Sequence, residues 1–235
     1  MQLPLSVQLQ DQFSFDSYWV GNNELAVDSL KTTVINHETS ISALNQFFVY
    51  APEQSGKTHL LVALSKLAEQ HGQTAYYIDL YSAVNLPVEI LQGLSEYRVI
   101  CIDNVHALSA SLQWQVAIFD LINQLREQQE SKQVIFSASC APNFLQISLP
   151  DLRSRLNASS IFRLHALSHD DLLGILTKRF HLRGININED TLTYIINRCE
   201  RRISALVSVV DQLDHASLQA KRKITIPFVK QTLGT

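Results

Sequence analysis

A chain of 235 residues is long enough for one sizeable domain, or for a domain with a small companion. With 46% hydrophobic residues, 17% charged residues and a net charge of −3, the sequence lacks the broad basic surface of a general DNA-binding protein. It shows neither a basic N-terminal segment followed by an apolar run nor an apolar stretch of membrane-spanning length, so we expect a soluble, cytoplasmic protein without membrane association. Its three cysteines lie apart without metal-ligand spacing, which favours reduced thiols and no metal held by a side-chain cluster.

The first two thirds of the chain alternate between strand and helix patterns. The opening MQLPLSVQLQDQ follows neither pattern, and we expect a mobile arm over 1–12. Continuous apolar runs, typical of parallel strands covered on both faces, then recur at 46–51, 74–80, 97–103, 132–139 and 160–164. Helical patterns at 57–70 and 112–126 lie between them. The sequence therefore predicts an α/β domain over 13–166, with a five-stranded parallel sheet flanked by helices.

From about residue 167 the strand signals stop and helical patterns continue. Ser168 is of a residue type that caps helices and is followed by two acidic residues, which indicates a helix start. Gly184 is the predicted stop of that helix. Further helical segments follow within 188–200, 201–220 and 226–233. We expect a small all-helical subdomain over 167–235, a lid of roughly four helices.

The stretch APEQSGKTH at 51–59 joins an apolar run to a helical pattern and nearly has the spacing of a phosphate-binding loop. In such a loop the backbone N–H groups and the helix N-terminus surround the phosphates of a nucleotide. We expect Lys57 to reach the outer phosphates and Thr58 to offer its hydroxyl to Mg²⁺. Ala51 replaces the usual first glycine, but its methyl is a small intrusion where φ is negative, so binding should survive. The predicted nucleotide-contacting residues of the loop are Pro52, Glu53, Gln54, Ser55, Gly56, Lys57, Thr58 and His59.

The run VICIDN at 99–104 is an apolar strand that ends in an acid. Asp103 has the position of a residue that orients Mg²⁺ through water. In many ATPases of this kind the next residue is also acidic and polarises the attacking water. Here it is Asn104, whose amide cannot accept a proton. The sequence thus predicts a site that holds nucleotide and hydrolyses it poorly by itself.

These motifs resemble the DnaA family of AAA+ ATPases, and the resemblance covers the whole chain. The segments 211–217 and 221–230 are especially similar to the Hda branch of that family. The resemblance implies that FSFDSYWVGNN at 13–23 lies against the adenine and ribose of a nucleotide, with Val20 and Gly21 among the contacts.

The resemblance also assigns two arginines and one serine to nucleotide chemistry. LPDLRSRL resembles the helix that bears an arginine finger, with Arg155 at the matching position and Arg153 as the competing choice. CERRISAL resembles the stretch with the second sensor arginine, which maps onto Arg201, beside Arg202. The first sensor position falls on Ser139, where relatives usually carry Asp or Asn.

QLPLSV, near the start of the chain, resembles the peptide by which replication proteins dock on the sliding clamp of DNA polymerase. Gln2, Leu3 and Leu5 match that peptide, whereas Ser6 and Val7 stand where Pro-Leu is common. Extended peptides of this kind bind through polar and apolar side chains in neighbouring pockets. The resemblance therefore implies a contact of Gln2, Leu3, Leu5 and Val7 with the clamp, the beta subunit.

The function implied by the resemblance is negative regulation of replication initiation. Bound to ADP (or ATP) with Mg²⁺ and docked on a DNA-loaded clamp, the protein would present Arg155 to the ATP-bound initiator DnaA and stimulate hydrolysis in trans. The chain carries no counterpart of the initiator's DNA-binding domain, so we expect no direct sequence-specific DNA binding; self-association stays open. One alternative is an autonomous AAA+ ATPase such as a helicase loader, which needs a water-activating residue that Asn104 does not supply. The other is a non-catalytic adaptor.

Overall fold

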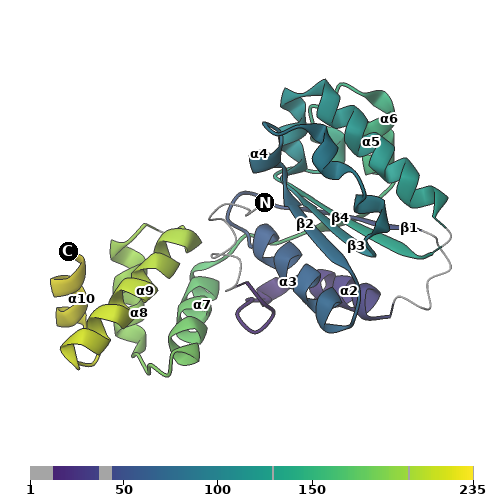
Figure 1. Ribbon diagram of the computed structural model, residues 1–235. Coiled ribbons are helices and arrows are strands. Elements are labelled where there is room, and N and C mark those ends of the chain that lie inside the picture. Colours follow the sequence, from purple (N-terminus) through teal and green to yellow (C-terminus); the bar gives the residue numbers. More distant parts are fainter. Residues whose placement is uncertain (1–12, 37–43, 129, 201, 235) are drawn as a thin grey trace. The chain divides into compact units, whose positions relative to one another are not determined.

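The chain folds into two compact units, which comprise residues Met1–Ala166 and Leu167–Thr235. The structure is a computed structural model (Figure 1), and it describes residues 13–36, 44–128, 130–200 and 202–234. The predicted arm over 1–12 lies outside the described residues.

The first unit is built on a parallel five-stranded sheet, which confirms the predicted fold class. In space the strands follow the order β2-β3-β4-β1-β5. Phe48 of β1 lies in register with Phe136 of β4 on one side and with Ile161 of β5 on the other. The strands are β1 (Leu44–Tyr50), β2 (Ala75–Asp79), β3 (Val99–Asp103), β4 (Lys132–Ala138) and β5 (Ser160–Arg163).

Helices cover both faces of this sheet (Figure 1). On one face lie α2 (Glu24–Ile35) and α3 (Lys57–Gln70), and on the other lie α4 (Leu80–Ala83), α5 (Leu112–Glu127) and α6 (Pro150–Asn157). Because the central strands β3 and β4 are buried on both faces, their sequences contain continuous apolar runs, whereas most residues of the edge strand β5 are exposed. Short 3-10 turns complete the unit: η1 (Gly21–Asn23), η3 (Val88–Leu91), η4 (Leu94–Glu96), η5 (Val105–Ala110) and η6 (Pro142–Phe144).

Strand β3 shows how the core is divided between the two faces. Val99 and Cys101 pack in the cluster of α2 and α3, whereas Ile100 and Ile102 pack in the cluster of α5 and α6. All four side chains are fully buried, and so is Asp103 at the carboxyl end of the strand. Successive side chains of β3 therefore point to opposite helix layers, and the carboxylate of Asp103 lies at the carboxyl edge of the sheet.

The strand order places β1 between β4 and β5. From β1 the chain crosses over β4 and β3 to β2 at one edge of the sheet, whereas β5 lies on the other side of β1. Carboxyl ends of parallel strands meet at one edge, and ligands of open α/β sheets bind in the crevice beyond that edge, where the strand order reverses. The loop that follows β1 therefore begins at the position where this architecture binds its ligands.

Helix α2 has no counterpart among the elements predicted from the sequence. Its N-cap is Asn23, a good capping type, but the side chain makes no capping hydrogen bond. Instead, Asn23 Oδ1 accepts the backbone N–H of His165, 2.7 Å away, after the last strand of the sheet. A contact across more than a hundred residues thus replaces the local start signal on which a sequence-based prediction depends.

The second unit consists, over its described residues, of α7 (His169–Leu182), α8 (Glu189–Arg198), α9 (Ile203–Ala220) and α10 (Ile226–Leu233). Ser168 caps α7 through a reciprocal capping box with Asp171, which confirms the predicted helix start. The guanidinium of Arg183 pairs with Asp211 and, at 3.4 Å, with Asp214, so the end of α7 is joined to α9. Over the part of the chain that the structure describes, none of the helices combines the length and the hydropathy of a membrane span.

Candidate functional site

The loop between β1 and α3 has the backbone shape that its sequence predicts. Positive φ occurs at Gln54 (63°) and Gly56 (82°), and Ala51 is not among the residues with positive φ. The alanine methyl is fully buried without backbone strain, so the replacement of the usual glycine is accommodated. At Gly56 a side chain would be strained by the left-handed backbone, and its Cβ would lie 3.5 Å from Tyr18 Cε2.

Lys57, the first residue of α3, turns its side chain back into the loop. Its Nζ donates to the carbonyl oxygens of Ala51 at 2.9 Å and Pro52 at 2.8 Å. Burial lowers the pKa of Lys57, while the carboxylates of Asp103 and Glu53 act in the opposite direction. A buried ammonium with acidic neighbours in a loop rich in N–H donors is suited to the outer phosphates of a nucleotide.

The carboxylate of Asp103 is the centre of the site. Its Oδ2 accepts the hydroxyl of Thr58 at 2.6 Å and that of Tyr77 at 2.9 Å, and its Oδ1 accepts the hydroxyl of Ser137 and the backbone N–H of Asn104. Burial, followed by the charge of Asp103, raises the pKa of Tyr77 well above its ordinary value, so the phenol stays protonated. The structure thus brings together the predicted Thr58 and Asp103.

Carboxylate and hydroxyl oxygens are the ligands that Mg²⁺ prefers, so Thr58 and Asp103 fit that cation together with nucleotide phosphates. Tyr77 and Ser137 were not predicted from the sequence. They come from β2 and β4, on either side of β3, and belong to no recognisable motif. Their role depends on strand order, which sequence spacing does not reveal.

Asn104 takes a left-handed backbone conformation, with φ of 59°. Its Nδ2 donates to Asp79 Oδ1 at 2.8 Å, and Asp79 in turn caps α4 by accepting the backbone N–H of Tyr81. The amide is therefore held as a donor to a carboxylate. In the position where related ATPases place an acid, this chain presents a group that cannot take a proton from water.

Ser139, the predicted first sensor position, lies next to His106, a residue that sequence reasoning missed. Its backbone N–H points at His106 Nδ1, 3.4 Å away, and His106 Nε2 lies 2.6 Å from the hydroxyl oxygen of Tyr81. Burial, followed by the charge of Lys57, lowers the pKa of His106, although Asp103, Glu53 and Asp79 oppose the shift. With Nδ1 as an acceptor, the neutral ring carries its proton on Nε2 and donates to Tyr81.

The segment before α2 packs onto the start of α3 through His59. The His59 Nε2 lies 2.9 Å from the carbonyl oxygen of Ser14 and 3.3 Å from the hydroxyl of Ser17, and its ring stacks on Phe13 at 4.8 Å. His59, a predicted nucleotide contact, thus anchors the segment that the resemblance places against the base. Val20, the N-cap of η1, and Gly21, its first residue, follow in that segment.

Arg155 lies in the last turn of α6, half-buried, whereas Arg153 is exposed. Within the part of the chain that the structure describes, the guanidinium of Arg155 has no hydrogen-bond or ion-pair partner. Burial and the charge of Arg155 lower the pKa of Arg126 at the end of α5, so two cationic side chains lie near each other there. Such a pair favours an anion from outside the chain.

Several predicted residues cannot be placed. Arg201, and the clamp-contact residues Gln2, Leu3, Leu5 and Val7, lie outside the described residues. Arg202 is exposed and donates to Glu200 at 2.8 Å.

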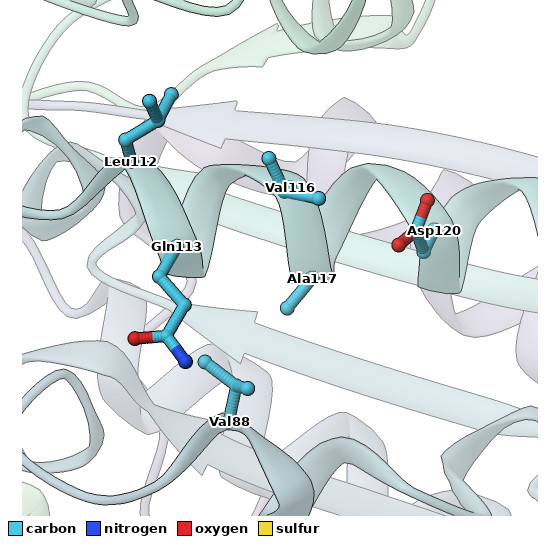
Figure 2. A pocket seen from close by; sticks show the side chains of 6 residues that line it. All are labelled: Val88, Leu112, Gln113, Val116, Ala117 and Asp120. Atoms are coloured by element: carbon cyan, nitrogen blue, oxygen red, sulfur yellow. The ribbon is translucent and has the colours of Figure 1, made fainter.

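A separate shallow hollow lies along α5, on the helix layer of α4, α5 and α6 (Figure 2). Leu112 and Val116 line it from α5 and are 60% and 42% exposed, and Val88 lines it from η3, on the side of Gln113 and Ala117. Sequence reasoning did not single out this surface. The remaining residues that line the hollow are Gln113, Ala117 and Asp120.

Comparisons with known proteins agree on the fold and on its relatives. Residues 9–162, about two thirds of the chain, match the family model of the bacterial DnaA ATPase domain, and residues 169–233 match the lid domain of Hda. Domain III of the replication initiation protein DnaA from Thermotoga maritima superposes with a TM-score of 0.77 at 18% identity, over 99% of this chain and 98% of that chain.

Two further solved structures extend this likeness. AMPPCP-bound DnaA from Aquifex aeolicus has a TM-score of 0.70 at 19% identity, and the match covers 88% of this chain and 67% of that chain. The RuvB Holliday junction branch migration motor of Thermotoga maritima also has a TM-score of 0.70, at 15% identity over 97% and 73% of the two chains. At these identities the structural likeness establishes the AAA+ fold, with its helical lid.

Proposed function

Because this chain belongs to the bacterial DnaA ATPase-domain family of AAA+ proteins and its lid matches that of Hda, we propose that it is a negative regulator of a DnaA-type initiator. One observation carries the proposal. Within the described residues, the half-buried guanidinium of Arg155 is unpaired, while the chain's own nucleotide site has Asn104 in the water-activating position. Such a molecule is built to act on a partner's nucleotide more readily than on its own.

The bound nucleotide in this proposal is ADP, with Mg²⁺. Lys57, Thr58 and the N–H groups of the loop would hold the phosphates, and Asp103 with Thr58 would hold the cation through its water shell. The cation would supply charge neutralisation between the phosphates. The role of Arg201 in sensing this nucleotide, and that of Ser139, remain proposals from the family resemblance.

Arg155 would act in trans on the initiator's ATP. A half-buried guanidinium that lies near a second cation, Arg126, complements the negative charge that spreads over a transferring phosphoryl group. The initiator would thereby pass to its ADP form. Docking on the DNA-loaded clamp through Gln2, Leu3, Leu5 and Val7 would raise the local concentration of the regulator.

The experiment that tests this function measures hydrolysis of initiator-bound ATP on clamp-loaded DNA, with ADP added, in the presence and absence of this protein. Strong stimulation supports the regulator. Absence of stimulation, together with robust ATP turnover by this chain alone, would instead identify an autonomous ATPase.

The contribution of the arm can be tested separately with Gln2→Ala and Leu5→Ala together. We expect this double variant to need about 10²-fold more protein for half-maximal stimulation on clamp-loaded DNA. The variant keeps Arg155, but it is no longer held near the initiator by the clamp, so its effective concentration there falls. Gln8→Ala, in the same arm but outside the matching positions, is the control and should behave as wild type. Equal behaviour of the double variant and the control would remove the clamp from the proposal.

Slow hydrolysis by the chain itself can be tested by exchanging two side chains, Asp79→Asn with Asn104→Asp. The exchange keeps a hydrogen bond between the pair and places a carboxylate at position 104, and aspartate tolerates the left-handed backbone there. We expect single-turnover hydrolysis of bound ATP to rise about 10²-fold or more, because an acceptor for the water proton is restored. An unchanged rate at unchanged nucleotide affinity would mean that Asn104 is not the limiting feature.

A further inference from the structure

Helix α6 makes polar contacts with the rest of the first unit near both of its ends, through two buried glutamines. Gln115 of α5 is 1% exposed, and Gln46 of β1 is 8% exposed. Buried amides need partners, and both side chains bond to the segments at the ends of this short helix. We infer that Gln115 and Gln46 are positioning residues that fix Arg155 in the geometry its action requires, an inference that rests on the proposed function.

The contact before the N-terminal end of α6 depends on an acceptor. Gln115 Oε1 accepts the backbone N–H of Ser148 at 3.0 Å, its hydroxyl at 2.9 Å and the backbone N–H of Leu149 at 3.0 Å. Leu149 is the N-cap of α6 and has no side chain that could cap the helix. A distant side chain therefore binds the N–H groups that enter the helix, and the direction of α6 depends on it.

Gln115 also connects α6 to the nucleotide edge of the sheet. Its Nε2 donates to the carbonyl oxygen of Leu108 at 2.9 Å, in the turn η5 that follows Asp103 and Asn104. The side-chain amide of Gln115 thus donates to η5, the turn after β3, and accepts hydrogen bonds from the residues that begin α6.

The contact near the C-terminal end of α6 depends on Gln46 as a hydrogen-bond donor. Gln46 Nε2 donates to the carbonyl oxygen of Arg155 itself at 2.6 Å and to the hydroxyl oxygen of Ser159 at 2.7 Å. The bond to Arg155 holds the backbone of the finger residue directly. Gln115 and Gln46 thus restrain the helix in opposite chemical senses, one by accepting hydrogen bonds and the other by donating them.

This difference makes a sharp test, because glutamate keeps acceptor oxygens and loses the donor. In the clamp-loaded hydrolysis assay we expect Gln115→Leu to lower the saturating stimulated rate about 10- to 100-fold, the scale for a misplaced catalytic group. A carboxylate at 115 keeps the acceptor for Ser148 and Leu149, and the carbonyl oxygen that it would face, that of Leu108, lies in η5 and not in α6, so Gln115→Glu should retain much more stimulation than Gln115→Leu. Gln46→Glu should lose it like Gln115→Leu, because a carboxylate would face the carbonyl oxygen of Arg155. Gln113→Leu, an exposed neighbour on α5, is the matched control.

Two further readouts separate positioning from a general loss of stability. The concentration for half-maximal stimulation and the affinity for ADP should stay within a few-fold of wild type, measured well below the melting temperature of each variant. Hydrogen exchange at the N–H groups of Ser148 and Leu149 should accelerate in Gln115→Leu and stay slow in Gln115→Glu.

The outcomes are distinct from those for the proposed function. If Arg155→Ala loses stimulation and folded Gln115→Leu keeps it, positioning by Gln115 is wrong while the finger stands. If Gln115→Leu fails to fold, the contrast between Gln115→Glu and Gln46→Glu decides, and equal rates for those two variants overturn the inference. If Arg155→Ala stimulates as well as wild type, the finger has been assigned to the wrong residue, whereas absence of stimulation by the wild-type protein would overturn the proposed function itself.

Discussion

Replacing Arg155 by alanine is expected to lower the stimulated hydrolysis of initiator-bound ATP by ~10³- to 10⁵-fold, the range known for arginine fingers supplied in trans. This corresponds to about 4–7 kcal/mol of transition-state stabilisation. The loss follows because the guanidinium would no longer stabilise the charge of the transferring phosphoryl group. Within the described residues this guanidinium has no hydrogen-bond or ion-pair partner, so the substitution breaks no such bond in the fold. The measurement is the single-turnover rate on clamp-loaded DNA.

Arg153→Ala is the matched control, since Arg153 lies on the same helix two residues earlier and is exposed. It should retain stimulation within a few-fold, and both variants should keep wild-type affinity for ADP. If the large loss follows Arg153 instead, the finger has been assigned to the wrong arginine. If neither substitution matters, α6 does not carry the finger.

Lys57→Ala is expected to weaken the chain's own binding of ADP about 30- to 3,000-fold. Loss of one partner from a buried, hydrogen-bonded charge pair costs about 2–5 kcal/mol, and every 1.4 kcal/mol is tenfold in affinity. Without nucleotide the substitution should lower the free energy of unfolding by about 1–3 kcal/mol, because the buried carbonyl oxygen of Ala51 loses its donor. Calorimetric titration with ADP measures the affinity directly.

A thermal scan gives a second measure of the same loss. A ligand at 100 times its dissociation constant stabilises a folded protein by about 2.7 kcal/mol, and in Lys57→Ala this increment should fall below about 1 kcal/mol at the same ADP concentration. Lys66→Ala, on the same helix, is the control and should keep the increment. If Lys57→Ala changes neither nucleotide binding nor contact with the partner, the non-catalytic adaptor is favoured.

The features that the sequence predicted well are those whose signal is contiguous. The five strands and helices α3 and α5 follow from runs of residues with one periodicity, and the loop at 51–59 follows from its place between a strand and a helix. The association of Thr58 with Asp103 follows because each motif ends at the same edge of the sheet.

The features that were missed depend on contacts between distant segments. Tyr77 and Ser137 reach Asp103 because β2 and β4 lie on either side of β3. No local sequence pattern indicates this strand order. Gln115 and Gln46 look like ordinary polar residues until the fold brings them to α6. Arg201 and the arm fall outside the described residues, so their roles stay predictions.

The four hydrogen bonds to Asp103 have a consequence for the evolution of such proteins. The bond from Thr58 joins the carboxylate to the phosphate-binding loop, whereas those from Tyr77, Ser137 and Asn104 hold neighbouring strands and the turn after β3 together. A lineage that no longer needed nucleotide would be free to change Lys57 long before Asp103. Among descendants, an intact aspartate would therefore be poor proof of nucleotide use, and an intact lysine would be much better proof.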